Sequence, residues 1–289
     1  MTLNHESSSK TITYWITALS NLFSHLEQVS KQRASLNLTQ SLILISLSDS
    51  KRKTRVGDIA KLLDLRANTT TAALSKLRSR DFIIKSKEQS DRRFSFISLT
   101  DKGIDTKHIL HREFIHYIDE FIFSYLSDER EYFTHLIQNH DSFPALEQGL
   151  DDVSFDTIII FFIRRLYLEF TYFLRSHDLN IIETRILLAS VASTPSETLS
   201  MLGKRLNVRQ NSLSIGVSEL EKKNLITKVI SNADNRAALL KLTDKGVELS
   251  HFLIEEIHGY SIRIGFDTKR ASQIAEKLVA ASNNIDRVY

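Results

Sequence analysis

A segment of 48 residues occurs twice in this chain, and the two copies align without a gap at an offset of 143 residues. Residues 56–103 and 199–246 are identical at 15 positions, including the run LTDKG at 99–103 and 242–246. A single fixed offset over this length indicates one duplicated domain, because a solenoid repeats units of about 20–50 residues several times. We therefore predict two related domains, residues 1–143 and residues 144–289.

Composition restricts what these domains can be. Only 8 glycines and 2 prolines occur among 289 residues, which disfavours tight-turned β architectures and favours helices. Cysteine is absent, which excludes disulfides, thiolate metal sites and thiol redox sensing. The N-terminal residues lack the apolar stretch of a secretory signal, and the most apolar run, residues 158–163, is far shorter than the roughly 20 residues that span a bilayer. We expect a cytoplasmic protein without a membrane anchor or a cofactor.

Positive charge is concentrated on the repeated segment. The whole chain has a net charge of only +3, but residues 51–93 hold 13 Lys or Arg against 5 Asp or Glu, a local charge of +8. The equivalent residues 194–236 hold 7 against 4, a local charge of +3. Because binding to phosphates requires such an excess, the distribution favours a nucleic-acid surface that is stronger in the first copy.

The beginning of each copy has the pattern of a helix–turn–helix. Residues 56–64 predict a short helix, and a second helix is expected to begin near Asn68, with Asn68 and its counterpart Asn211 as N-caps. Helical spacing directs residues 70, 73, 74 and 77 inward and leaves a polar outer face: Thr69, Thr71, Ser75, Lys76 and Ser79. Short hydroxyl side chains allow close approach to base edges, while Lys and Arg bind phosphates. The second helix is therefore predicted to enter a major groove.

A β-hairpin is predicted to follow, with strands near residues 82–87 and 93–99 around a polar turn. Its tip carries Asp91, Arg92 and Arg93, and the second copy has Asp234 and Arg236 at the same positions. An arginine at such a tip can enter the minor groove of A·T-rich DNA, which is narrow and strongly negative. Asp91 is expected to hold that arginine extended through a hydrogen-bonded ion pair. The second tip has one positive charge fewer.

Apolar stripes at helical spacing flank each copy. They predict helices near residues 12–29 and 155–174 before the copies, and near 104–126 and 247–266 after them. The simplest interpretation is that these stripes are ordinary hydrophobic core. The alternative is that the end helices of both halves pack into one helical base with pseudo-two-fold symmetry. Residues 141–152, which include Pro144 and Gly149, form the expected joint between the domains.

The order of helix–turn–helix, hairpin, D-x-R tip and L-T-x-K-G leading into a long helix resembles the MarR superfamily. The tandem layout resembles the two-domain members of the staphylococcal SarA group, and the resemblance covers about residues 12–285. It implies a mainly α fold with small β-hairpins (α+β), two winged helix-turn-helix domains on a shared helical base, and a monomer that acts as a pseudo-dimer. The N-terminal thiol of some SarA-type members is absent.

The same resemblance implies a regulator of transcription, an activator or a repressor, that binds A·T-rich promoter DNA and controls virulence or surface and secreted protein genes. By motif position, the minor-groove role falls on Arg93 and Arg236. The candidate DNA-binding residues of the first domain are Arg66, Asn68, Thr69, Thr71, Ser75, Lys76, Lys85, Asp91, Arg92 and Arg93. Those of the second domain are Arg209, Gln210, Asn211, Ser212, Ser214, Ser218, Asp234 and Arg236.

The second domain is expected to contribute less to binding, because Glu219 and Glu221 replace Lys76 and Arg78, and carboxylates repel phosphates. Other functions stay open at this point. The winged helices can serve as a protein–protein interaction module, or the chain can be a repressor that responds to a small ligand or a metal. His108, His111 and His116, with Glu113 and Asp119 nearby, are the metal candidates, but the second copy has no matching cluster. An enzyme is not expected, because the chain lacks a P-loop, a G-x-G-x-x-G motif and a nucleophile elbow.

Overall fold

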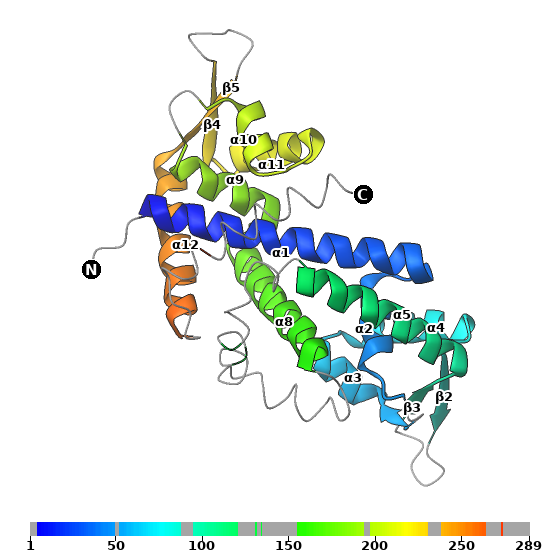
Figure 1. Cartoon of the computed structure of the whole chain (residues 1–289). Coiled ribbons are helices and arrows are strands. Elements are labelled where there is room, and N and C mark those ends of the chain that lie inside the picture. The colour runs from blue at the N-terminus through cyan, green and yellow to red at the C-terminus, as the bar shows by residue number, and fades with distance from the viewer. Residues whose placement is uncertain are drawn as a thin grey trace. The chain divides into compact units, whose positions relative to one another are not determined.

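The computed structural model describes residues 5–49, 52–87, 95–120, 131, 134, 155–193, 197–230, 238–263 and 273. Within these residues the chain is mainly helical with two small antiparallel sheets, which confirms the predicted mainly α fold with small β-hairpins (Figure 1). The chain forms two compact units. The first-repeat unit comprises residues 22–168, and the second-repeat unit comprises residues 1–21 and 169–289. None of the described helices combines the length with the hydropathy that a membrane span requires.

The same series of elements occurs in both repeats. The first repeat contains α2 (Leu38–Ser46), α3 (Val56–Leu62), α4 (Ala67–Ser79), β2 (Ile83–Lys87), β3 (Ser95–Leu99) and α5 (Asp101–Ile118). The second repeat contains α9 (Ile181–Val191), α10 (Leu199–Arg205), α11 (Gln210–Lys222), β4 (Ile226–Ile230), β5 (Ala238–Leu242) and α12 (Asp244–Arg263). Each of these elements begins 143 residues after its counterpart, so the duplicated sequence has a duplicated secondary structure.

Two long helices lead into the repeats, α1 (His5–Ala34) and α8 (Phe155–Ser176). The first turns of α1 belong to the second-repeat unit, where Ile12 and Ile16 join a hydrophobic core that includes Leu187, Leu213 and Leu253. The part of α8 up to residue 168 belongs to the first-repeat unit. The boundaries of the compact units therefore differ from those of the repeats, because each unit includes part of the helix that leads into the other repeat.

The core of the first-repeat unit is built around α2. All residues from Ser41 to Ser46 are buried in this helix, and Leu26 of α1 and Phe114 of α5 are buried in the same unit. A capping box closes the start of α2: the Asn37 side chain accepts from the Gln40 N–H, and the Gln40 side chain accepts from the Asn37 N–H. Asn180 and Glu183 form the same box at the start of α9.

Left-handed backbone residues mark three turns in each repeat. Such conformations are uncommon for residues other than glycine, and Asn and Asp tolerate them best. The six non-glycine residues with positive φ in the described part of the chain form pairs at the same offset, Ser35 with Asp178, Asp64 with Asn207, and Asp81 with Asn224. Five of the six are Asp or Asn, which explains how a chain so poor in glycine makes these turns.

The sheets are small antiparallel hairpins, as predicted. β2 and β3 pair from Ile83↔Leu99 to Lys87↔Ser95, and β4 and β5 pair from Ile226↔Leu242 to Ile230↔Ala238. The first sheet has an additional strand that the sequence did not predict, β1 (Thr54–Arg55), which pairs with β3 and gives the order β1-β3-β2. Two residues are too few for an alternating pattern to be recognised.

Candidate nucleic-acid interface

The first repeat contains the predicted helix–turn–helix. Helix α3 ends in a Schellman motif, in which the Asp64 N–H donates to the Lys61 carbonyl and the Leu65 N–H donates to the Ala60 carbonyl. The left-handed conformation of Asp64 makes this turn possible. The turn directs the chain into α4, which begins two residues after Leu65.

The outer face of α4 is polar and exposed, as predicted. The opposite face packs against the rest of the first-repeat unit through its buried residues, Thr70, Ala73, Leu74 and Leu77. The residues that face outward are all exposed: Arg66, Asn68, Thr69, Thr71, Ser75, Lys76 and Ser79. This face has small side chains in its first turns and the longer Lys76 and Arg78 in its last turns.

The prediction that Asn68 caps this helix is wrong. Arg66 occupies the N-cap with φ −67° and ψ 149°, and it makes no side-chain capping hydrogen bond. Arg209 has the same position before α11, so the prediction for Asn211 is wrong as well. The Schellman turn closes at Leu65, and the next residue already has N-cap geometry. The geometry of the turn therefore overrides the local capping preference of asparagine, which lies inside the first turn of the helix.

Further cationic side chains are exposed in the same repeat. Arg78, Lys85 and Lys87 are exposed, and no carboxylate among the described residues forms an ion pair with Lys76, Arg78 or Lys85. Strand β1 adds Arg55, whose guanidinium lies 5.9 Å from the ring centroid of Phe96 on β3. Arg55 belongs to no motif of the sequence, and neither do the exposed Arg52 and Lys53 before it. The local excess of positive charge was the only sign of them.

The second repeat presents a different outer face. Gln210, Asn211 and Ser214 of α11 are exposed, whereas Ser212 and Ser218 are half-buried. Ile215, which replaces Ala72 of the first repeat, is 57% exposed and adds an apolar side chain to this face.

The charges on α11 are neutralised locally. Lys222 donates to Glu219 at 2.6 Å, and Lys228 donates to Glu221 at 2.6 Å. The hydrogen bond from Lys222, together with its positive charge, lowers the pKa of Glu219 below its ordinary value. At the positions of Lys76 and Arg78, the second repeat therefore has carboxylates, and each of them forms an ion pair with a neighbouring lysine.

The predicted wing tips lie outside the described residues. This holds for Asp91, Arg92 and Arg93 in the first repeat and for Asp234 and Arg236 in the second. The strands that lead to them are described, and Lys85 on β2 is exposed. The expected joint at 141–152 also lies outside the described residues.

The shared LTDKG run is explained by structure alone. Thr100 caps α5 by accepting from the Gly103 N–H at 3.0 Å, and its hydroxyl donates to the Asp81 carbonyl at 2.7 Å. Lys102 donates to the Arg80 carbonyl at 2.8 Å. Thr243, Lys245 and Gly246 repeat these bonds in the second copy. The run therefore fixes the start of α5 to the end of α4 and needs no contact with a ligand.

The three histidines of α5 have separate partners. His108 contacts Asp49 at 2.8 Å, His111 contacts Thr157 at 2.6 Å, and His116 lies 3.4 Å from Glu120. Burial raises the pKa of Asp49, but hydrogen bonds from His108 and Lys107 outweigh it and hold that pKa below its ordinary value. No cluster of three or more possible metal ligands occurs in the described part of the chain.

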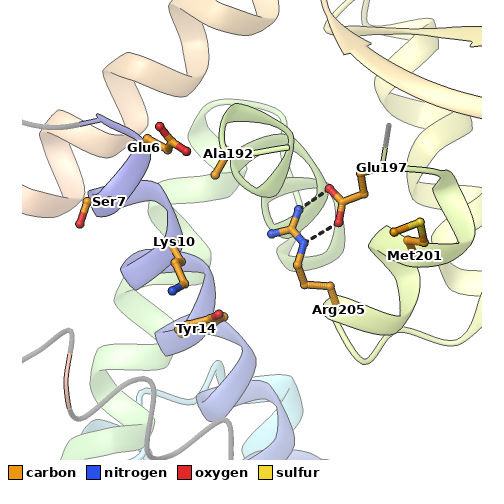
Figure 2. A pocket seen from close by; sticks show the side chains of 8 residues that line it. All are labelled: Glu6, Ser7, Lys10, Tyr14, Ala192, Glu197, Met201 and Arg205. Carbon is orange, nitrogen blue, oxygen red and sulfur yellow. Dashed lines mark hydrogen bonds and ion pairs between the residues drawn. The ribbon is translucent and has the colours of Figure 1, made fainter. Parts of the chain in front are cut away.

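A cavity of about 460 Å³ lies in the second-repeat unit (Figure 2). It is lined by Glu6, Ser7, Lys10, Tyr14, Ala192, Glu197, Met201 and Arg205. Arg205 donates twice to Glu197 at 2.7 Å, and Ser193 donates to the same carboxylate. Burial raises the pKa of Glu197, but these hydrogen bonds and the charge of Arg205 outweigh it and lower the pKa. Glu197 and Arg205, two of the charged groups in the wall, are therefore paired with each other.

Comparison with known sequences finds proteins that are similar to part of this chain. The model of the family "Transcriptional regulator SarA/Rot" matches residues 25–110. The HTH-type transcriptional regulator SarZ of Staphylococcus epidermidis is 29% identical over 75 residues, which are 26% of this chain and 50% of SarZ. The chain thus spans half the length of the curated relatives that it matches.

Two solved structures from Streptomyces coelicolor are also similar. The MarR family transcriptional regulator Sco3205, crystallised in complex with DNA, is 22% identical with a TM-score of 0.40, and the match covers 43% of this chain and 78% of Sco3205. The MarR family transcriptional regulator AbsC is 21% identical with a TM-score of 0.39, and the match covers 47% of this chain and 92% of AbsC.

The region that matches the family model contains the helix–turn–helix, both strands of the hairpin and the LTDKG run of the first repeat. These are the elements from which the candidate interface is built. Over residues 25–110 the chain is therefore similar to the family of SarA/Rot transcriptional regulators.

Proposed function

We propose that this chain is a transcriptional regulator that binds double-stranded DNA chiefly through its first repeat. The outer face of α4 is the observation that carries the proposal. It combines exposed hydroxyl groups at Thr69, Thr71 and Ser75 with Lys76 and Arg78, which no described carboxylate neutralises. A solvated helix has no need of this pattern, whereas a helix in a major groove needs both parts of it.

In this mode α4 enters the major groove, with Thr69, Thr71 and Ser75 toward the base edges. Arg66 and Lys76 bind the phosphates that flank the groove. Lys85 lies on the strand that leads to the tip, and Arg93 enters the adjacent minor groove of A·T-rich promoter DNA. The relatives that support this proposal are named as regulators of transcription. The targets we propose are virulence or surface and secreted protein genes.

The second repeat supplies a second head of the same construction, with α11 as its recognition helix. One chain then presents two heads to half-sites about 34 Å apart, as a dimer of single-head proteins would. Glu219 and Glu221, which form ion pairs with Lys222 and Lys228, make the second head bind DNA more weakly than the first. Because the two heads differ, the preferred DNA site need not be a perfect palindrome.

The two wing arginines provide the test. Arg93→Ala is expected to lower the affinity for an A·T-rich duplex about tenfold, because a groove contact by arginine contributes about 1–3 kcal/mol. Arg236→Ala is expected to lower it by less than about threefold, because the second head contributes less. Fluorescence anisotropy at one fixed salt concentration measures both. Equal losses of affinity would contradict the proposal that the first head contributes more to binding than the second. No loss in either variant would contradict the proposal that the wings bind DNA.

A further inference from the structure

In both repeats an arginine binds the main-chain carbonyl at the end of the first helix of the helix–turn–helix. Arg164 of α8 donates through Nη1 to the Leu63 carbonyl, and Arg185 of α9 donates through Nη2 to the Leu206 carbonyl. Leu63 and Leu206 are equivalent residues, and they are the C-caps of α3 and α10. Each contact lies within a single compact unit. We call these two hydrogen bonds the turn contacts.

The carbonyl that accepts the turn contact is one that the backbone does not use in the turn. The last four carbonyls of a helix have no partner within the helix, and a Schellman motif satisfies two of them. Here the motif uses Ala60 and Lys61 in the first repeat, and Gly203 and Lys204 in the second. The Leu63 carbonyl then takes a charged donor, which makes a stronger hydrogen bond than a neutral donor and is favoured at a helix C-terminus.

The two repeats obtain this arginine from different helices. The first-repeat position equivalent to Arg185 is Leu42, which is buried and apolar, so the first repeat has no internal donor there. It uses Arg164 of α8 instead, from the helix that leads into the second repeat. The position in α1 equivalent to Arg164 is Asn21, whose side-chain nitrogen is buried without a hydrogen-bond partner among the described residues.

We infer that Arg164 is a positioning residue that fixes the turn before the recognition helix α4, so that DNA binding by the first repeat depends on a side chain of α8. The inference rests on the proposed function. Only Leu65 and Arg66 separate the left-handed Asp64 from the first residue of α4, so a shift of the turn changes the direction in which α4 leaves the head. Arg164 acts through the main chain of the turn and not through a base or a phosphate.

The first measurement is amide hydrogen exchange on the full-length protein without DNA. Arg164→Ala is expected to accelerate exchange of the Asp64 and Leu65 amides about tenfold, because a hydrogen bond from a charged donor is lost beside them. The equivalent amides of Asn207 and Val208 should be unaffected. Arg185→Leu is the matched control, because leucine is the residue at the equivalent position in the first repeat. It should accelerate exchange of the Asn207 and Val208 amides and leave those of Asp64 and Leu65 unaffected.

The second measurement is the affinity for an A·T-rich duplex. Arg164→Ala is expected to weaken binding about tenfold, and Arg164→Lys should restore most of the loss because its ammonium group can donate to the same carbonyl. Arg185→Leu should change the affinity by less than about threefold. The double variant L42R/R164L moves the arginine to the position that the second repeat uses, and it should recover both amide protection and affinity. If the buried arginine prevents this variant from folding, the Arg164→Lys result decides.

The outcomes separate the two claims. Unchanged exchange at Asp64 and Leu65 in Arg164→Ala overturns the turn contact, whatever the DNA result. Faster exchange with unchanged affinity overturns the positioning role. If the unaltered chain fails to bind DNA, the proposed function is overturned, and the exchange data still report on the turn contact by themselves.

Discussion

Replacing Lys76 and Arg78 by glutamate is expected to lower the affinity for DNA by about a hundredfold or more at about 0.1 M salt. Each phosphate contact releases a counterion and contributes about 0.9 to the slope of log affinity against log salt, so two lost contacts correspond to roughly 60-fold at this concentration. The introduced carboxylates add repulsion. Both side chains lie on α4, and Lys76 belongs to its exposed outer face. The salt slope should fall by about two, measured by anisotropy in a salt series.

The equivalent positions of the second repeat provide the matched control for K76E/R78E. E219A/E221A removes the carboxylates that bind Lys222 and Lys228 and is expected to cause no loss of affinity. If this control weakens binding as much as K76E/R78E does, the assignment of the first repeat as the main DNA-binding head is wrong.

Gly103→Ala is expected to destabilise the first-repeat unit by about 2–3 kcal/mol. A Cβ at this position would lie 2.0 Å from the carbonyl oxygen of Phe82, so the main chain must shift to accommodate it. Forcing extra volume into a packed site typically costs this much. Chemical denaturation of the full chain measures the change in the free energy of unfolding, and Gly246→Ala should act in the same way on the second-repeat unit, since its Cβ would meet the Leu225 carbonyl.

Gly57→Ala is the control for this clash. No atom lies within 4 Å of a Cβ built on Gly57, which lies in the first turn of α3. Alanine is a better helix former than glycine, so this change should stabilise the unit by up to about 1 kcal/mol. A Gly103→Ala variant as stable as the unaltered chain would contradict the structural role given to the LTDKG run.

Sequence patterns predicted the elements of the head and the faces of its helices well. The buried positions Thr70, Ala73, Leu74 and Leu77 follow the helical period, and such a period is visible in any single sequence. The LTDKG run identified the repeat and the family resemblance, but its structural role could not be predicted from the sequence alone. Only the structure shows that Thr100 and Lys102 donate to the carbonyls of Asp81 and Arg80 just after α4. It also shows that Gly103 packs closely against the Phe82 carbonyl just before β2.

Features that depend on distant contacts could not be predicted. The N-cap of α4 was placed at Asn68 from local preference, whereas the turn at Asp64 determines that Arg66 occupies it. An apolar stripe shows that a helix is buried but not against what, so residues 12–29 left open whether Ile12 and Ile16 pack with their own repeat or with the second one. Arg164 was missed for the same reason, because no local pattern connects it to a carbonyl in the first repeat.

A titration of an A·T-rich duplex of about 25 base pairs decides whether one chain occupies both half-sites, because a duplex of this length holds two half-sites one helical turn apart. Anisotropy is followed at stoichiometric concentration and then repeated at several salt concentrations. We predict one chain per duplex, a steep fall of affinity with salt, and a slope reduced by about two in K76E/R78E. Two chains per duplex would contradict the single-chain pseudo-dimer, and absence of binding at every salt concentration would contradict the claim that this chain binds DNA.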